Sequence, residues 1–203
     1  MKQLSPVRRP FARVPLTALS VLLLCVALTS SPAIAEDADA PLFSADGYRI
    51  DKFRAPVPDS VDGAATLTTV RLQSLLKQPG VVLLDVLPAP VKPKNRPANL
   101  LWLPPDRYDI PGSHWLPNVG YGALSNELER YFKNNLASLT GGDKAKPIVV
   151  YCLADCWMSW NAARRAATEY GYTRVYWYPD GTNGWEAAGM SLEKRVPVER
   201  DAP

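Results

Sequence analysis

Two cysteines four positions apart are the residues of this sequence best suited to chemistry. Cys152 follows the apolar run 147–151, and Cys156 comes directly before a helical pattern at 157–170. Both thiols therefore stand at a strand-to-helix turn, where free backbone N–H groups and the positive end of the helix dipole favour an anion. A thiolate is such an anion, so we expect a lowered thiol pKa and raised reactivity. Asp155 opposes this effect, because it adds a negative charge beside the thiols.

Three uses of the pair follow from the residues. The first is a structural disulfide, although the loop-closure model offers only about 2 kcal/mol for so short a ring. The second is a reactive dithiol in which Cys152 attacks, Cys156 resolves, and the backbone amides of residues 153–157 cradle the sulfur anion. The third is a copper site with His114, the only histidine of the chain, because thiolates select Cu(I) and imidazole also suits copper.

The elements that must position the cysteines alternate between strands and helices. Buried or short strands are predicted at 81–86, 114–116, 147–151 and 175–178, and helices at 68–77, 124–139, 157–170 and 181–185. This alternation predicts a single α/β domain with a mostly parallel sheet and helices on both faces. Ligands of such sheets bind beyond the carboxyl ends of the strands, where Asp85, Cys152 and Asp180 lie.

The segments around these elements differ in character. Residues 36–65 read as an irregular lead-in, 66–195 as the domain and 196–203 as a tail. Residues 87–109 contain six prolines, which predicts a long loop without a helix. Connections between elements are usually shorter, so this loop is a candidate for function.

The first 35 residues have the three parts of a signal peptide. Arg8, Arg9 and Arg13 form a basic start, residues 16–28 form an apolar core, and 33–35 form an Ala-x-Ala cleavage site. The core is short for a bilayer span. We therefore expect export to the periplasm, by the Sec route rather than the twin-arginine route because the core is rather hydrophobic for the latter.

Removal of this leader changes the charge balance. The whole chain has a formal net charge of +3, but the remaining 168 residues carry 19 basic and 20 acidic side chains. A near-neutral chain gives no reason to expect a nucleic-acid partner. It has no second long apolar run, so we expect no membrane span after cleavage. The two remaining cysteines would meet a compartment that favours disulfides.

Landmarks along the chain resemble those of rhodanese domains over roughly residues 66–192. They are Leu83-Leu84-Asp85-Val86, Asp109-Ile110-Pro111-Gly112-Ser113, Val149-Val150-Tyr151-Cys152, Ala162-Ala163, Gly171-Tyr172, Val175 and Gly184-Trp185. The resemblance implies a rhodanese-like fold whose active loop starts with a nucleophile at Cys152. Around it, we take Leu153, Ala154, Asp155 and Trp157 as candidate binding residues, together with Asp85 at the neighbouring strand end.

More narrowly, the chain is similar to exported rhodanese-like proteins associated with PQQ-dependent catabolism, which are named for a Cys-x-x-Cys-Trp motif. Here the motif is Cys152-Leu153-Ala154-Asp155-Cys156-Trp157, with three residues between the cysteines. The resemblance implies a role in support of periplasmic quinoprotein alcohol oxidation, with a quinoprotein dehydrogenase or its cytochrome as partner. We expect no cofactor bound to the chain itself.

One departure from the rhodanese pattern bears on the activity. The rhodanese loop runs from its cysteine to an arginine that helps to hold the anionic substrate, but residues 153–159 contain no arginine or lysine. Thiol–disulfide exchange or persulfide relay is therefore expected in place of thiosulfate sulfur transfer. The alternative is a non-catalytic accessory or binding protein of the same system, with a structural disulfide or a copper site.

Overall fold

The computed structural model describes residues 41–97 and 99–199. The predicted signal peptide and residues 200–203 of the predicted tail lie outside these ranges. Within the ranges, no helix has the length and apolar character that a membrane span requires.

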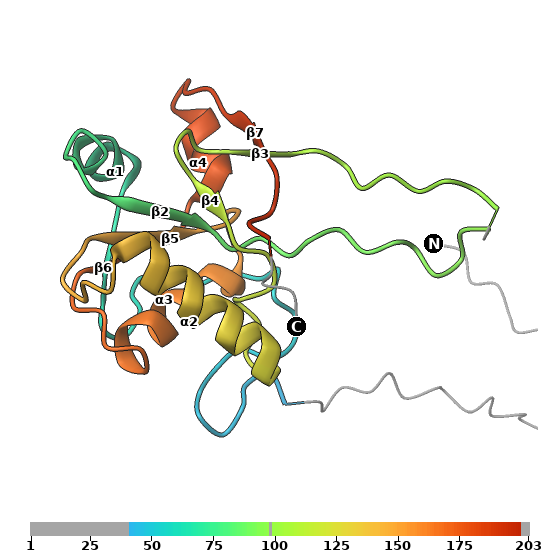
Figure 1. The fold of residues 1–203 in the computed structure, drawn as a ribbon, viewed down its shortest axis with the longest axis horizontal. Coiled ribbons are helices and arrows are strands. Elements are labelled where there is room, and N and C mark those ends of the chain that lie inside the picture. Colours follow the sequence, from blue (N-terminus) through green and yellow to red (C-terminus); the bar gives the residue numbers. More distant parts are fainter. Residues whose placement is uncertain (1–40, 98, 200–203) are drawn as a thin grey trace, which may run out of the picture. The chain divides into compact units, whose positions relative to one another are not determined.

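A five-stranded parallel sheet forms the centre of the domain (Figure 1), in the order β1-β6-β5-β2-β4. Its strands are β1 (Ala64–Thr66), β2 (Val82–Asp85), β4 (His114–Trp115), β5 (Ile148–Tyr151) and β6 (Val175–Tyr178). All side chains of β2 and β5 are buried, as expected for central strands covered on both faces.

Helices cover both faces of this sheet. They are α1 (Thr69–Leu75), α2 (Asn126–Thr140), α3 (Trp157–Thr168) and α4 (Gly181–Ala187). Alternate residues of the central strands pack to opposite sides: Leu84 and Val150 join Phe132 of α2 and Ala162 of α3. Their neighbours Leu83, Val149 and Tyr151 join Leu72 of α1 and Trp185 of α4. The predicted α/β fold is thus confirmed.

Helix boundaries follow from local capping. The Thr68 hydroxyl accepts a hydrogen bond from the Arg71 amide (3.4 Å), and the Ser125 hydroxyl accepts one from the Leu128 amide (3.2 Å). Gly141 ends α2 with φ +65, a left-handed conformation that glycine adopts without a steric penalty. By contrast, the N-cap residue of α3 is Cys156, whose side chain makes no capping hydrogen bond.

Three short strands are missing from the sequence-based prediction. β1 begins inside the segment expected to be irregular, and β3 (Arg107–Asp109) lies inside the expected loop. β3 pairs antiparallel with β7 (Glu193–Arg195) in a separate two-stranded ribbon. Each strand has three residues without alternating large apolar side chains, so hydrophobic periodicity could not reveal them. Before β3, the chain leaves the sheet as a long extended loop (Figure 1).

Candidate functional site

The two cysteines stand at the strand-to-helix turn that the sequence predicts. Cys152 directly follows β5 and Cys156 directly precedes α3, and a disulfide joins them with their Cα atoms 6.6 Å apart. Cys152 is 0% and Cys156 2% exposed. The pair therefore lies at the carboxyl end of a central parallel strand, where α/β proteins place their sites, but both sulfurs are closed off from solvent.

The first turn of α4 holds one side of the cysteine loop. The Thr182 amide donates to the Cys152 carbonyl (3.1 Å), and the Ala154 amide donates to the Asn183 side-chain carbonyl (3.0 Å). Gly181 has φ +54, and a Cβ atom there would overlap the Cys152 carbonyl. Only glycine lets this turn approach the loop so closely.

The lead-in holds the other side of the loop as a short antiparallel bridge. The Trp157 amide donates to the Phe53 carbonyl (2.9 Å), and the Ala55 amide donates to the Asp155 carbonyl (3.1 Å). These two bonds place Arg54 directly opposite Cys156. In a pair flanked by hydrogen bonds in this way, the two side chains project to the same face with Cβ atoms about 4.5–5.5 Å apart.

Arg54 thus supplies a cation beside a loop that has none of its own. Its side chain is exposed, and it has no ion pair with any residue that the structure describes. Sequence reasoning missed it, because Arg54 lies about a hundred positions before the cysteines. Its neighbours Phe53 and Ala55 are partly buried against the core, whereas Arg54 between them is exposed. This alternation of buried and exposed side chains is the local signal for an extended segment.

Trp157 anchors the lead-in to α3. Its indole N–H donates to the Pro56 carbonyl (3.1 Å), its ring meets Phe43 edge to face at 5.3 Å, and Arg49 lies over it at 5.0 Å. Trp157, which the sequence predicts as a candidate binding residue, is therefore buried against the lead-in. Leu153 and Ala154 are partly buried, and Asp155 is exposed with φ +51.

The expected cradle of five backbone amides needs a correction. The amides of Ala154 and Trp157 already donate to Asn183 and Phe53, so they are not free to bind a sulfur anion in this disulfide state. Cys156 occupies the N-cap position of α3 without making a side-chain hydrogen bond. After reduction, its thiolate would stand where helix N-termini stabilise negative charge.

Asp85 lies in a buried charge cluster next to the site. One carboxylate oxygen accepts from the Leu87 amide (2.9 Å), and the other lies 2.6 Å from Arg107 Nε. Arg107 Nε is also 2.7 Å from Asp109. Burial, together with the neighbouring Asp85 carboxylate, raises the pKa of Asp109 to about 8. Asp85 therefore acts here as a turn cap and counter-ion, one strand away from Cys152.

Tyr151 connects this cluster to the cysteine that follows it. Its hydroxyl hydrogen-bonds with the Ser113 hydroxyl (2.6 Å) and accepts from the Ile110 amide (3.1 Å). Burial, and then the negative charges of Asp85 and Asp109, raise the pKa of Tyr151 well above its ordinary value. Tyr151 is therefore a neutral structural group that fixes the start of the loop.

The other candidate residues take structural positions. Arg164 donates to the Asp46 carbonyl (2.8 Å), and Arg165 donates to the Gly122 carbonyl (2.7 Å), so neither replaces the missing loop arginine. His114 lies on β4 opposite Leu84, and burial lowers its pKa. Among the side chains of 41–97 and 99–199, no three or more metal-ligating groups gather. Asp180 caps α4 only through its backbone position.

Comparisons with known proteins agree with the resemblance of the landmarks. The family model for the rhodanese-like domain matches residues 68–188. No curated protein matches the sequence. The part of the chain that matches excludes the lead-in, so Arg54 lies outside the family's common region.

Several solved structures are similar at low identity. A thiosulfate sulfurtransferase from Pseudomonas aeruginosa is 19% identical with a TM-score of 0.45; the match covers 69% of this chain and 22% of that one. A polysulfide-sulfur transferase from Wolinella succinogenes is 20% identical with a TM-score of 0.41, over 69% and 85% of the two chains. This chain thus spans about a fifth of the first of these proteins.

Proposed function

This chain belongs to the rhodanese-like domain family, and from that premise we propose that it acts on sulfur through Cys152 and Cys156, by thiol–disulfide exchange or persulfide relay. The observation that carries the proposal is the disulfide across the strand-to-helix turn at the carboxyl end of β5. A staple for stability would better join distant segments, because the closed ring spans only a few residues. A bond confined to the active-loop position suits a pair that opens and closes.

The exchange reaction balances with a partner disulfide as oxidant. The Cys152 thiolate attacks one partner sulfur, forms a mixed disulfide and releases the other partner sulfur as a thiolate. The Cys156 thiolate then attacks the Cys152 sulfur, closes the bond seen here and releases the second partner thiolate. The partner gains two electrons and the pair loses two. In a persulfide relay, Cys152 would instead accept a sulfur atom from a donor persulfide and pass it to an acceptor thiol.

The cellular setting is part of the same proposal. A leader at 1–35 would send the chain to the periplasm, and the Cys-x3-Cys-Trp motif supports a role beside quinoprotein alcohol oxidation. A quinoprotein dehydrogenase or its cytochrome would then be the partner. Cys156→Ser should trap this partner as a mixed disulfide at Cys152, and Cys152→Ser should trap nothing. Capture of no periplasmic protein, or of an equal set by both variants, would count against this setting.

A competing function is a non-catalytic accessory or binding protein with a structural disulfide. The burial of both sulfurs favours it, because a closed disulfide does not exchange with a protein partner. A copper-binding form of this alternative would need ligands beyond the two thiolates. It predicts that separate serine substitutions of the two cysteines leave partner affinity unchanged.

The reduction potential of the pair decides between these functions. It is measured on purified, metal-free protein equilibrated in glutathione buffers, with thiols quantified by alkylation and mass spectrometry. Exchanging dithiols have potentials of about −120 to −230 mV, so a value in that range supports the redox proposal. Structural disulfides lie below about −300 mV, and such a value would make the accessory role the better account.

A further inference from the structure

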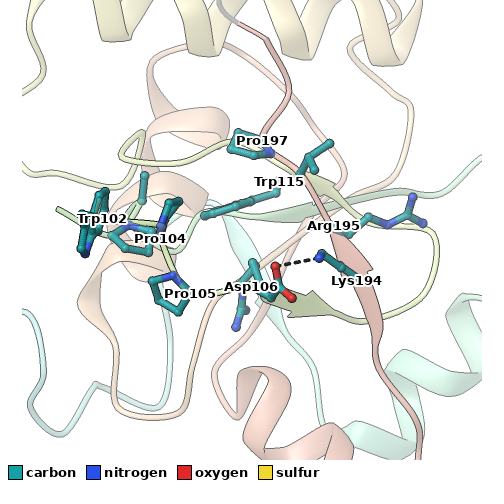
Figure 2. A pocket seen from close by; sticks show the side chains of 12 residues that line it. Trp102, Pro104, Pro105, Asp106, Trp115, Lys194, Arg195 and Pro197 are labelled. Carbon is teal, nitrogen blue, oxygen red and sulfur yellow. Dashed lines mark ion pairs between the residues drawn. The ribbon is translucent and has the colours of Figure 1, made fainter. Parts of the chain in front are cut away.

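A pocket with a volume of about 220 Å³ lies between the end of the long loop and the β3–β7 ribbon (Figure 2). Its walls are mainly flat and apolar: Trp102, Trp115, Pro90, Pro104, Pro105 and Pro197. The Trp115 indole is held in place, because its N–H donates to the Leu87 carbonyl (2.7 Å). Mostly apolar walls with a few polar groups are typical of sites for small molecules.

Two arginines line the same pocket from opposite strands. Arg107 and Arg195 are direct partners in the β3–β7 register, and like charges in that relation destabilise a ribbon. Carboxylates partly compensate: Arg107 pairs with Asp85 at 2.6 Å, and Arg195 pairs with Glu193. Both arginines therefore contribute to the wall of one cavity.

Each of these arginines also has a buried nitrogen without a partner. Arg107 Nη2 and Arg195 Nε make no hydrogen bond to any residue that the structure describes. Lys194 differs, because its ammonium group is committed to Asp106 at 2.7 Å, the ion pair drawn as a dashed line in Figure 2. A buried donor without an acceptor is unfavourable, so both guanidinium groups keep a hydrogen-bonding capacity that the described residues do not use.

We propose that this pocket binds a small planar apolar carboxylate, with Trp102 and Trp115 against its rings and Arg107 and Arg195 on its carboxylate. The guanidinium fork matches a carboxylate in geometry and forms charge-assisted hydrogen bonds with it. The cavity is smaller than the range of about 300–1,000 Å³ that drug-sized ligands occupy. A ligand with one or two rings therefore fits better than a large cofactor.

The surrounding charges allow such an anion. Arg107 faces both Asp85 and Asp109, Arg195 faces Glu193 and Lys194 faces Asp106, so the charges balance when Asp109 is neutral. Burial and the adjacent Asp85 raise the pKa of Asp109 to about 8, which favours the neutral form of that carboxyl. The site uses neither cysteine, and its occupation does not depend on the proposed function.

Binding of 2-naphthoate and of its neutral counterpart 2-naphthamide tests the proposal. Both are titrated into ¹⁵N-labelled protein, and the tryptophan indole resonances report occupation of the pocket. We expect 2-naphthoate to bind at least tenfold more tightly than the amide. Arg195→Gln should remove this preference, whereas Lys194→Gln, the matched control on the next residue, should keep it. Trp102→Ala should weaken both ligands.

The result can contradict the proposal in several ways. Equal affinity for acid and amide, or no indole shift with either, would overturn it. An equal loss in Arg195→Gln and Lys194→Gln would reduce the effect to general surface charge and also overturn it. If Arg195→Gln does not fold, Arg195→Lys serves in its place: it retains the charge but lacks the planar fork, and the preference for the acid should fall by several-fold.

Discussion

Arg54 and Cys156 face each other across the antiparallel bridge that ties the lead-in to the cysteine loop. A cation at this position favours the thiolate of the reduced protein. We expect Arg54→Gln to slow alkylation of the Cys156 thiol at pH 7 by about three- to tenfold, since one pKa unit changes the thiolate fraction about tenfold. Rates at each cysteine are followed by mass spectrometry on reduced protein.

The matched control for this prediction is Arg71→Gln, which removes an exposed arginine from α1. It should leave both rates unchanged. Arg54→Lys should retain most of the reactivity because it keeps the charge. An unchanged rate in Arg54→Gln would show that the helix N-terminus alone sets the acidity of Cys156, and the role of the lead-in cation would be withdrawn.

Asp109 makes the stability of the fold depend on pH. Its folded-state pKa is raised to about 8 from an ordinary value of 3.8, by burial first and then by Asp85, while Arg107 and Arg195 lower it. The folded state therefore binds a proton that the unfolded chain has released above pH 4. This contribution to stability is complete below about pH 4 and is lost as pH rises through about 8, by at most about 1.4 kcal/mol per pH unit.

Asp109→Asn should remove this dependence. Urea unfolding of both proteins at pH 5, 6, 7 and 8 gives the free energy of unfolding at each value. We expect the advantage of the wild type over the variant to shrink steadily over this range. His114, whose lowered pKa acts in the opposite direction, is present in both proteins and cancels in the difference. Parallel curves would mean that Asp109 is already ionised at pH 5.

At the scale of elements, the lead-in acts as a cover over the disulfide. The Ala55 amide donates to the Asp155 carbonyl (3.1 Å), and proline at this position has no N–H to donate. We expect Ala55→Pro to accelerate reduction of the disulfide by dithiothreitol several-fold, because the closed sulfurs become accessible more often. Ala55→Gly retains the donor and serves as the control. Equal rates in the wild type and both variants would show that the reductant reaches the sulfurs by another route.

The elements that position the site were largely predictable. Continuous apolar runs such as Ile148–Tyr151 predict buried strands, and the helical spacing of apolar residues in α2 predicts a helix. β1, β3 and β7 were not predictable, because three-residue strands are stabilised by their partners rather than by their own pattern. The same reason hides the pairing of Arg54 with Cys156, as well as the meeting of Arg107 with Arg195. Contacts between segments that are distant in the sequence form both the cysteine site and the pocket. Sequence periodicity predicts only local structure, so it could not reveal them.

At the scale of the whole molecule, redox state and folding are linked. The free energy by which the disulfide stabilises the fold equals the free energy by which folding stabilises the disulfide against reduction. The loop-closure model gives about 2 kcal/mol for this short ring, through the unfolded chain alone. For a domain of this size, about 2 kcal/mol corresponds to a shift of about 4–8 °C in Tm. If the folded state accepts the dithiol and the disulfide equally well, reduction should lower the Tm by no more than this. A fold that requires the disulfide would lose considerably more.

Calorimetry of the oxidised and reduced protein measures this difference directly. The Cys152→Ser/Cys156→Ser double variant, scanned with and without reductant, corrects for effects of the reductant on the rest of the chain. We expect a shift within the 4–8 °C limit, because the loop is already fixed by Gly181, Asn183 and the lead-in without help from the sulfurs. Such a pair can change its redox state while the domain stays folded, which a relay requires. A loss well above the limit would identify the disulfide as part of the architecture and would favour the accessory role.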